Sequence, residues 1–192
     1  QLQSSAASDV YKRQVRSNPT YGFSIVKYDG TGANATVGHG LGAAADMIMV
    51  KRLVGGNQDW AVYHSGAQTT GAKSAKINVP GAAFVSDSTT WQNQAPNSTN
   101  FSIGTNPESN SPVQSHIAYC WTSIPGFSSF GEYDGTGGKN FIYCGFKPAF
   151  VMLKCHNAPG QQWNITDSSR VGPDGNTIPV SYTHLRAHET AY

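Results

Sequence analysis

The pentapeptide YDGTG occurs twice in this chain of 192 residues, at Tyr28–Gly32 and at Tyr133–Gly137. The flanking residues also agree: GFSIVKY precedes the first occurrence and GFSSFGEY the second, and the runs DMIMVKR and AFVMLKC follow them. Each run leads into a polar turn and a tryptophan, in NQDWAVYHS and GQQWNITDS. An ordered match of this length indicates a diverged internal duplication, so the fold must accommodate two related units.

We expect copy one at about residues 21–65, an intervening excursion at about 66–124, and copy two at about 125–170. Trp60 and Trp163 occupy matching positions in the two copies, which favours a shared role in core packing. Each copy alone would leave one apolar face uncovered, so we expect the copies to pack face to face or to continue one sheet. An approximate two-fold should relate them.

The repeated turn is expected to have a structural role. Asp29-Gly30 and Asp134-Gly135 are typical of tight hairpins, which require positive φ values, and Tyr28 and Tyr133 would pack at the end of the incoming strand. Gly-rich acidic turns also bind calcium, but one carboxylate per turn provides too few ligands. We therefore expect no metal at either turn.

Both ends of the chain resemble sequencing-adapter DNA that has been translated as protein, in SSAASDVYKRQ and VSYTHLRAHET. We expect residues 1–14 and 181–192 to be adapter-derived and residues 15–180 to form a single domain. The natural protein would then extend beyond both ends.

The short apolar runs are strand-like. Val, Ile, Phe, Tyr, Trp and Thr fill them, leucine is scarce, and no stretch keeps helical periodicity over three turns. We predict an all-β, antiparallel β-sandwich-like domain built from the duplication. The expected strands are Phe23–Tyr28, Ala35–His39, Met47–Arg52, Trp60–His64, Ala75–Val79, Asn100–Ile103, His116–Ser123, Phe127–Tyr133, Asn140–Phe146, Phe150–Cys155 and Trp163–Thr166.

Composition excludes several classes of function. The net charge is +2, only 12% of residues are charged and no basic cluster stands out, so nucleic acid is not an expected partner. No apolar run is long enough to cross a membrane. The three cysteines, Cys120, Cys144 and Cys155, have no CxxC spacing, and we expect buried free thiols and no cofactor.

No catalytic motif is present. The chain contains no GxSxG elbow, P-loop, HExxH or dinucleotide fingerprint, and its acidic residues lie mostly in turns or at strand ends. A glycosidase requires two converging carboxyl groups, which this arrangement does not offer. His39 and His64 are the histidines closest to a site-like setting, and we interpret both as packed strand-end residues. We expect no enzyme activity.

If the domain binds a ligand, we expect a polar glycan on an aromatic platform. Trp91 is the first candidate, because it lies in the polar excursion beside Gln92, and Tyr63 with His64 is the second. In the alternative interpretation, Trp91 is a plug that pins its long loop to the sandwich.

The ordered motifs carry a family resemblance. GFSIVKYDGTGANATVGHGLGAAADMIMVKR, DWAVYHS, DSTTWQNQAPNSTNFSIGT, HIAYCWTSIPGFSSFGEYDGTGGKNFIYCGFKPAFVMLKC and QQWNITDSSR together resemble a β-rich domain of unknown biochemical role. That domain is found near the C-terminal ends of tail-fibre-like and other structural virion proteins in tailed phages of marine bacteria. The family would have Pro where this chain has Ala45, which concerns only the rigidity of that corner.

The resemblance implies a non-enzymatic structural or adhesion module in a virion that is assembled in the host cytoplasm. Its partners would be other virion proteins or further copies of itself, with weak binding to a host-surface glycan. It supplies no catalytic residues. Two alternatives stay open: a polysaccharide depolymerase domain of a tail fibre, and a lectin-like domain of an extracellular bacterial surface protein.

Overall fold

The computed structural model describes residues 13–68, 70–79, 83–169 and 180–181, and the prediction of an antiparallel all-β chain is confirmed. One helical turn, α1, spans Pro107–Asn110, and two 3-10 turns span Pro19–Tyr21 and Ser65–Ala67. The strands are β1 (Arg13–Asn18), β2 (Phe23–Asp29), β3 (Ala35–Gly38), β4 (Met47–Arg52), β5 (Ala61–His64), β6 (Lys73–Lys76), β7 (Val85–Ser86), β8 (Asn100–Ile103), β9 (Ser115–Trp121), β10 (Phe150–Leu153), β11 (Asn164–Asp167) and β12 (Val180–Ser181).

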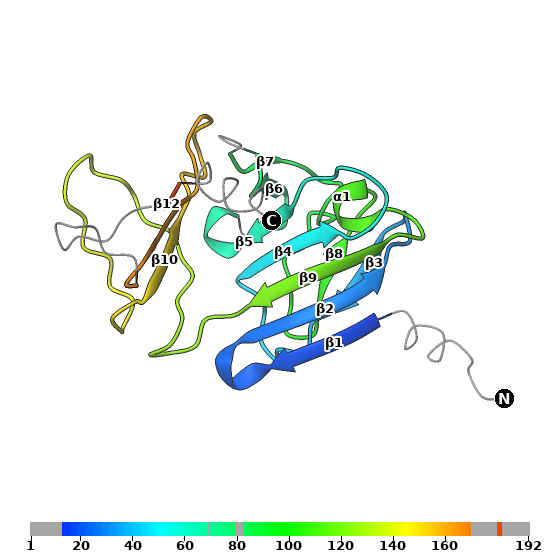
Figure 1. The fold of residues 1–192 in the computed structure, drawn as a ribbon, viewed down its shortest axis with the longest axis horizontal. Helices are drawn as coiled ribbons and strands as arrows, with labels where there is room; N and C mark the ends of the chain where they lie inside the picture. The colour runs from blue at the N-terminus through cyan, green and yellow to red at the C-terminus, as the bar shows by residue number, and fades with distance from the viewer. Residues whose placement is uncertain (1–12, 69, 80–82, 170–179, 182–192) are drawn as a thin grey trace.

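The main sheet has seven strands in the order β1-β2-β9-β4-β5-β6-β7 (Figure 1). Strand β9 lies between β2 and β4, so that Tyr119 pairs with Ile25 on one side and with Met49 on the other. Its sequence SHIAYCW alternates buried with half-buried residues, as expected for a strand with one face on the core. Copy one therefore depends on a strand from the excursion to join its own two strands.

The principal core lies on one face of this sheet. Strands β3 and β8 pair as a separate two-stranded sheet, and their side chains Val37 and Phe101 pack with Val26 and Ile48 of the main sheet. The arrangement is two-layered, with the layers held together by apolar side chains. A smaller cluster on other residues includes Met47, with Met49 packed beside it.

The second sheet, β10-β11-β12, has its own strand pairing and repeats part of the main sheet (Figure 1). It packs against the main sheet through Met152 and Trp163, which join the smaller cluster, and Trp163 Nε1 donates to the carbonyl oxygen of Lys76 at 3.1 Å. Phe150 pairs with Asp167, and in the main sheet Met47 pairs with His64; both partners are shifted along the chain by the same number of residues. Strand β12 then pairs with β11, as β6 pairs with β5. The order β4-β5-β6 thus recurs as β10-β11-β12.

The predicted duplication of the whole unit is not confirmed. Residues 127–133 and 140–146, which were expected to be strands, form no strand in the structure. In copy one the equivalent segments are held by neighbours, because β2 pairs with β1 and β9, and β3 pairs with β8. No described strand pairs with either segment of copy two, so their strand-forming residues have no ladder to join.

Two strands cross the boundaries expected for the adapter-derived ends. Arg13 and Gln14 pair with Tyr28 and Lys27 as part of β1, and Ser181 pairs with Asn164 as part of β12. Residues 1–12 and 182–192 lie outside the described residues, so their origin stays a prediction.

Candidate functional site

The expected Trp91 platform is wrong, because only 1% of this residue is exposed. Its ring meets Tyr63 and Phe101 edge-on, with ring centroids 6.1 and 6.3 Å apart. The next side chain, Gln92, fastens the loop by donating from Nε2 to the carbonyl oxygens of Ala35 at 2.9 Å and Ile103 at 2.6 Å. Trp91 is therefore the plug of its loop, as the alternative interpretation proposed.

The second expected cluster is also structural. Tyr63 is buried, and burial raises the pKa of its hydroxyl. His64 is half-buried and its Nδ1 accepts a hydrogen bond from the Gly66 amide at 3.0 Å, which caps the following 3-10 turn. Burial lowers the pKa of His64, partly offset by the charge of Asp46. Trp91, Tyr63 and His64 thus form no open binding platform.

His39 is likewise a packed residue. It is fully buried, its Nδ1 accepts from the Leu41 amide at 3.2 Å, and its Nε2 lies 2.9 Å from the carbonyl oxygen of Asn97. Burial lowers its pKa, although the contact with Asn97 acts in the opposite direction. Both ring nitrogens of the neutral His39 are engaged in hydrogen bonds, so neither is left to bind a ligand.

The YDGTG turns differ from the expected hairpin. Strand β3 pairs with β8 and not with β2, and the positive φ values fall on Gly32 and Gly137, at +70° and +74°. Gly30 is required for another reason: a Cβ there would lie 2.1 Å from the carbonyl oxygen of Ser111. The expected positive φ at Gly30 and Gly135 is therefore wrong, although the turn is a structural feature.

Tyr28 and Tyr133 share a motif but not an environment. Tyr28 is buried, stacks on His116 with ring centroids 5.2 Å apart, and donates its hydroxyl proton to the carbonyl oxygen of Ser109 at 2.6 Å. Burial raises the pKa of Tyr28 well above its ordinary value. Tyr133 is exposed. The packing expected for both tyrosines is found only in copy one.

The paired tryptophans keep the same local contacts but not the same burial: Trp163 is buried in the smaller core cluster, whereas Trp60 is half-buried, so the expected core packing is wrong for Trp60. The Lys51 ammonium lies 5.9 Å from the centre of the Trp60 ring, and the Lys154 ammonium lies 5.9 Å from the centre of the Trp163 ring. Both lysines also donate to a main-chain oxygen at matching positions, Lys51 to Gln58 and Lys154 to Gln161. The same two lysine contacts therefore stabilise both turns, which supports a structural role for both tryptophan rings.

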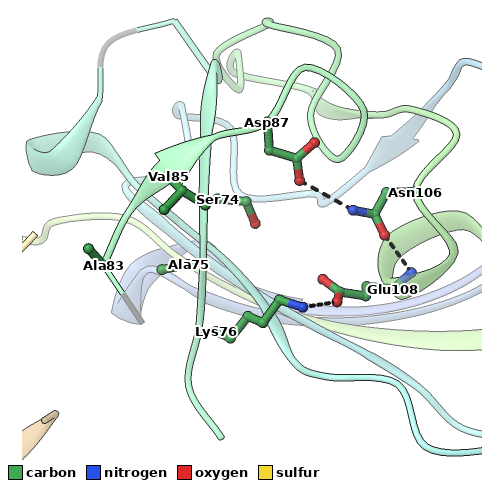
Figure 2. A pocket seen from close by; sticks show the side chains of 8 residues that line it. All are labelled: Ser74, Ala75, Lys76, Ala83, Val85, Asp87, Asn106 and Glu108. Carbon is green, nitrogen blue, oxygen red and sulfur yellow. Dashed lines mark hydrogen bonds and ion pairs between the residues drawn. The ribbon is translucent and has the colours of Figure 1, made fainter. Parts of the chain in front are cut away.

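A polar hollow of about 170 Å³ opens between β6, β7 and the start of α1 (Figure 2). The sequence did not predict this hollow, because three segments that are separated along the excursion form its walls. The Asn-Pro pair at the start of α1 was a signal, since Asn caps helices and Pro favours the first position. The lining residues are Ser74, Ala75, Lys76, Ala83, Val85, Asp87, Asn106 and Glu108.

Two charged side chains that line this polar hollow, Lys76 and Glu108, form an ion pair with each other. Lys76 forms ion pairs with Asp59, at 2.9 Å, and with Glu108. Partial burial would lower the pKa of Lys76, but the hydrogen bonds and charges of the two carboxylates outweigh it, so the pKa is raised. Partial burial would raise the pKa of Asp59, but Lys76 and Asn78 outweigh it and lower the pKa. This network ties β6 to α1.

Asp87 is similarly engaged. Its carboxylate accepts from the amide and hydroxyl of Thr89, at 2.8 and 2.6 Å, from Thr90, and from Nδ2 of Asn106 at 3.2 Å. Burial would raise its pKa, but the threonine hydrogen bonds outweigh it and hold the pKa below the usual range. Asp87 is therefore ionised at neutral pH and unsuited to act as a general acid.

The apolar surface of copy two is the second unusual feature. Seven large side chains of residues 127–153 are exposed, and Phe141 and Tyr143 are almost entirely so. We call this set the copy-two apolar surface: Phe127, Tyr133, Phe141, Ile142, Tyr143, Phe150 and Leu153. The set spans both faces of β10, because Phe150 and Leu153 are three residues apart on the strand, and exposed apolar side chains of this kind mark contact surfaces in soluble proteins.

Cysteines and other groups add little chemistry. Cys120 is buried as expected and its pKa is raised to about 12, but Cys144 is half-buried and Cys155 is exposed, so that expectation is wrong for two of the three thiols. Within the described ranges, no three His, Cys, Asp or Glu side chains gather as metal ligands. No helix in the described part of the chain is long and apolar enough to cross a bilayer.

Comparison with known proteins gives one match. Residues 3–190 match a family that is described as a domain of unknown function, DUF7483. No curated protein and no solved structure matches the chain.

Proposed function

The chain belongs to the DUF7483 family of domains of unknown function, and we propose that it is a non-enzymatic structural and adhesion module of a phage virion protein of the tail-fibre type. Two things support this proposal: the ordered motifs from Tyr21 to Arg170, which resemble such virion domains, and the nature of the exposed surface.

The copy-two apolar surface is the observation that carries the proposal. The chain is otherwise poor in charge and rich in small polar residues, yet seven large apolar side chains stay in contact with water. Leaving them exposed forgoes the stabilisation of burial, about 25 cal/mol for each Å² of apolar area. A surface of this kind acts by packing against protein, so the proposed partners are other virion proteins or further copies of the chain.

The polar hollow favours a structural role over the depolymerase alternative. Glycoside hydrolysis needs one protonated and one ionised carboxyl on either side of a bond. Asp59 and Asp87 have lowered pKa values, and Glu108 is paired with Lys76. These carboxylates stabilise loops and leave no acid for proton transfer.

Mass spectrometry of purified virus particles tests the proposal. Trypsin should release Asn140–Lys154 as one peptide, because Pro148 blocks cleavage after Lys147. We expect this peptide in the virion fraction of a marine sample that carries the gene, and no release of reducing sugar when the purified chain is incubated with bacterial polysaccharides. Recovery of the peptide from cell envelopes alone would favour the bacterial surface protein instead, and sugar release would favour the depolymerase.

Weak glycan binding is the second candidate function, and the polar hollow is the place that favours it. Most of the accessible lining of this hollow is apolar, and Lys76, Asn106 and Glu108 add a few polar groups, which is the combination that ligand sites use. Titration of the isotope-labelled chain with host-surface glycans should shift the amide resonances of Ser74 and Asn106. Shifts confined to other residues, or none at all, would rule the polar hollow out as a glycan site.

A further inference from the structure

Equivalent residues of the two copies differ sharply in burial. Tyr28 is 3% exposed and its counterpart Tyr133 is 47% exposed. Val50 is fully buried, and Leu153, at the same place in the repeated hairpin, is 40% exposed. One face of the copy-two hairpin packs into the smaller core cluster through Met152 and Trp163, whereas the face equivalent to the principal core of copy one, which carries Leu153, stays exposed.

The same holds for the segment between the turn and the hairpin. Val37 and Ile142 each stand shortly before a glycine with a positive φ, Gly40 at +71° and Gly145 at +80°. Val37 is buried, whereas Ile142 is exposed. The glycine with a positive φ has been kept in copy two, whereas the strand that precedes it in copy one, β3, has no counterpart there.

The residues that cover the core of copy one come from the excursion. Ala118 and Cys120 of β9, Phe101 of β8 and the plug Trp91 all pack against Tyr28 and its neighbours. Beyond β11, no described segment takes the place of these strands. What is missing from copy two is thus defined by the structure of copy one.

Strand β10 also has a free edge. In the main sheet β4 pairs with β5 on one side and with β9 on the other, whereas β10 pairs with β11 and with no other described strand. Residues Phe150–Leu153 contain no proline and no charge, the features that usually protect an edge. The next residue along the chain is the cation Lys154, but its ammonium lies over the Trp163 ring and donates a hydrogen bond to the carbonyl oxygen of Gln161.

We propose that the free edge of β10, together with Leu153 and Tyr133 of the copy-two apolar surface, is an acceptor site for an antiparallel β-strand of the β9 type. The occupant is an extended polypeptide with apolar residues at alternate positions. It pairs with Phe150–Leu153 as Ala118–Trp121 pairs with Met47–Val50, and its inward side chains cover Leu153 and Tyr133. The inference does not depend on a virion origin, because it rests only on the repeated hairpin and its uncovered face.

A peptide with the sequence of residues 113–123, carrying Cys120→Ala, is the probe for the full chain. Fluorescence anisotropy should show saturable binding of the labelled peptide. The same peptide with Ala118→Pro and Tyr119→Pro should bind at least about tenfold more weakly, because neighbouring N–H groups of a strand point to opposite edges and one of the two prolines therefore removes a hydrogen bond to β10.

A matched pair of protein variants locates the site. Leu153→Lys should weaken peptide binding by about tenfold or more, because it places a charge where the apolar side chains of the peptide would pack. Val54→Lys replaces an exposed aliphatic residue just beyond β4 and should leave binding unchanged. Circular dichroism confirms that each variant is folded.

Four results would overturn the proposal: no binding of the peptide, equal binding of the proline peptide, equal loss of binding in Val54→Lys, or unchanged binding in Leu153→Lys. Light scattering provides a further check. A stable dimer that Leu153→Lys dissociates would mean that a second copy of the chain occupies the edge, which also contradicts the proposal.

Discussion

Truncation of the plug residue, Trp91→Ala, is predicted to destabilise the domain strongly. Trp91 is 1% exposed, so nearly all of its side chain, roughly 150–250 Å² for a tryptophan, is removed from water. At about 25 cal/mol for each Å², this burial corresponds to roughly 4–6 kcal/mol. Substitution of buried aromatic residues by alanine costs about 3–5 kcal/mol, which is the loss we expect.

The loss should be visible by both urea and thermal denaturation, followed by circular dichroism. For a chain of this size, each kcal/mol lowers Tm by roughly 2–4 °C, so Trp91→Ala should lower Tm by roughly 6–20 °C. Trp60→Ala is the matched control, because Trp60 is only half-buried and stacks on Tyr119 at the sheet surface. We expect a clearly smaller loss for it. Equal losses, or a loss below about 1 kcal/mol for Trp91→Ala, would refute the plug.

Three further outcomes follow from buried groups. Burial lowers the pKa of His39 and His116, so the unfolded chain takes up protons near pH 6.5 that the folded chain excludes; Tm should change little between about pH 7 and 8 and fall below about pH 6.5, and a Tm that rises on acidification from pH 7 would contradict this. Ellman's reagent should modify Cys155 quickly and Cys120 only after unfolding, and modification of both thiols in the folded chain would be incompatible with the burial of Cys120. Asn110→Ala should cost about 2–4 kcal/mol in urea unfolding, because the Asn110 amide bonds four main-chain groups within the fold, and a loss below about 1 kcal/mol would show that these bonds are dispensable.

The repeated hairpin was predictable from the sequence because its signals are local. The apolar run, the polar turn and the tryptophan recur at Met47–Arg52 and at Phe150–Leu153, and so does the lysine that rests on the tryptophan. Such a hairpin carries most of its determinants within one short segment, so reading the residues in order is sufficient.

The failures concern long-range pairing. Residues 127–133 and 140–146 have strand-forming side chains, but a strand also needs a neighbour, and pairing over long distances cannot be read from composition. The position of β9 between β2 and β4 was hidden for the same reason. Trp91 stands in a polar run that suggests exposure, and only its contacts with Tyr63 and Phe101 show that the ring turns inward.

Hydrogen exchange in the matched strands β4 and β10 tests most directly the claim that copy two repeats the hairpin of copy one without its covering strand. Strand β4 is paired on both edges, so all of its amides should be protected. In β10, the amides that face β11 should be protected, while those on the free edge should exchange rapidly and become protected when the residue 113–123 peptide is added. Full protection of β10 without the peptide would show that its edge is already covered, and would contradict the account.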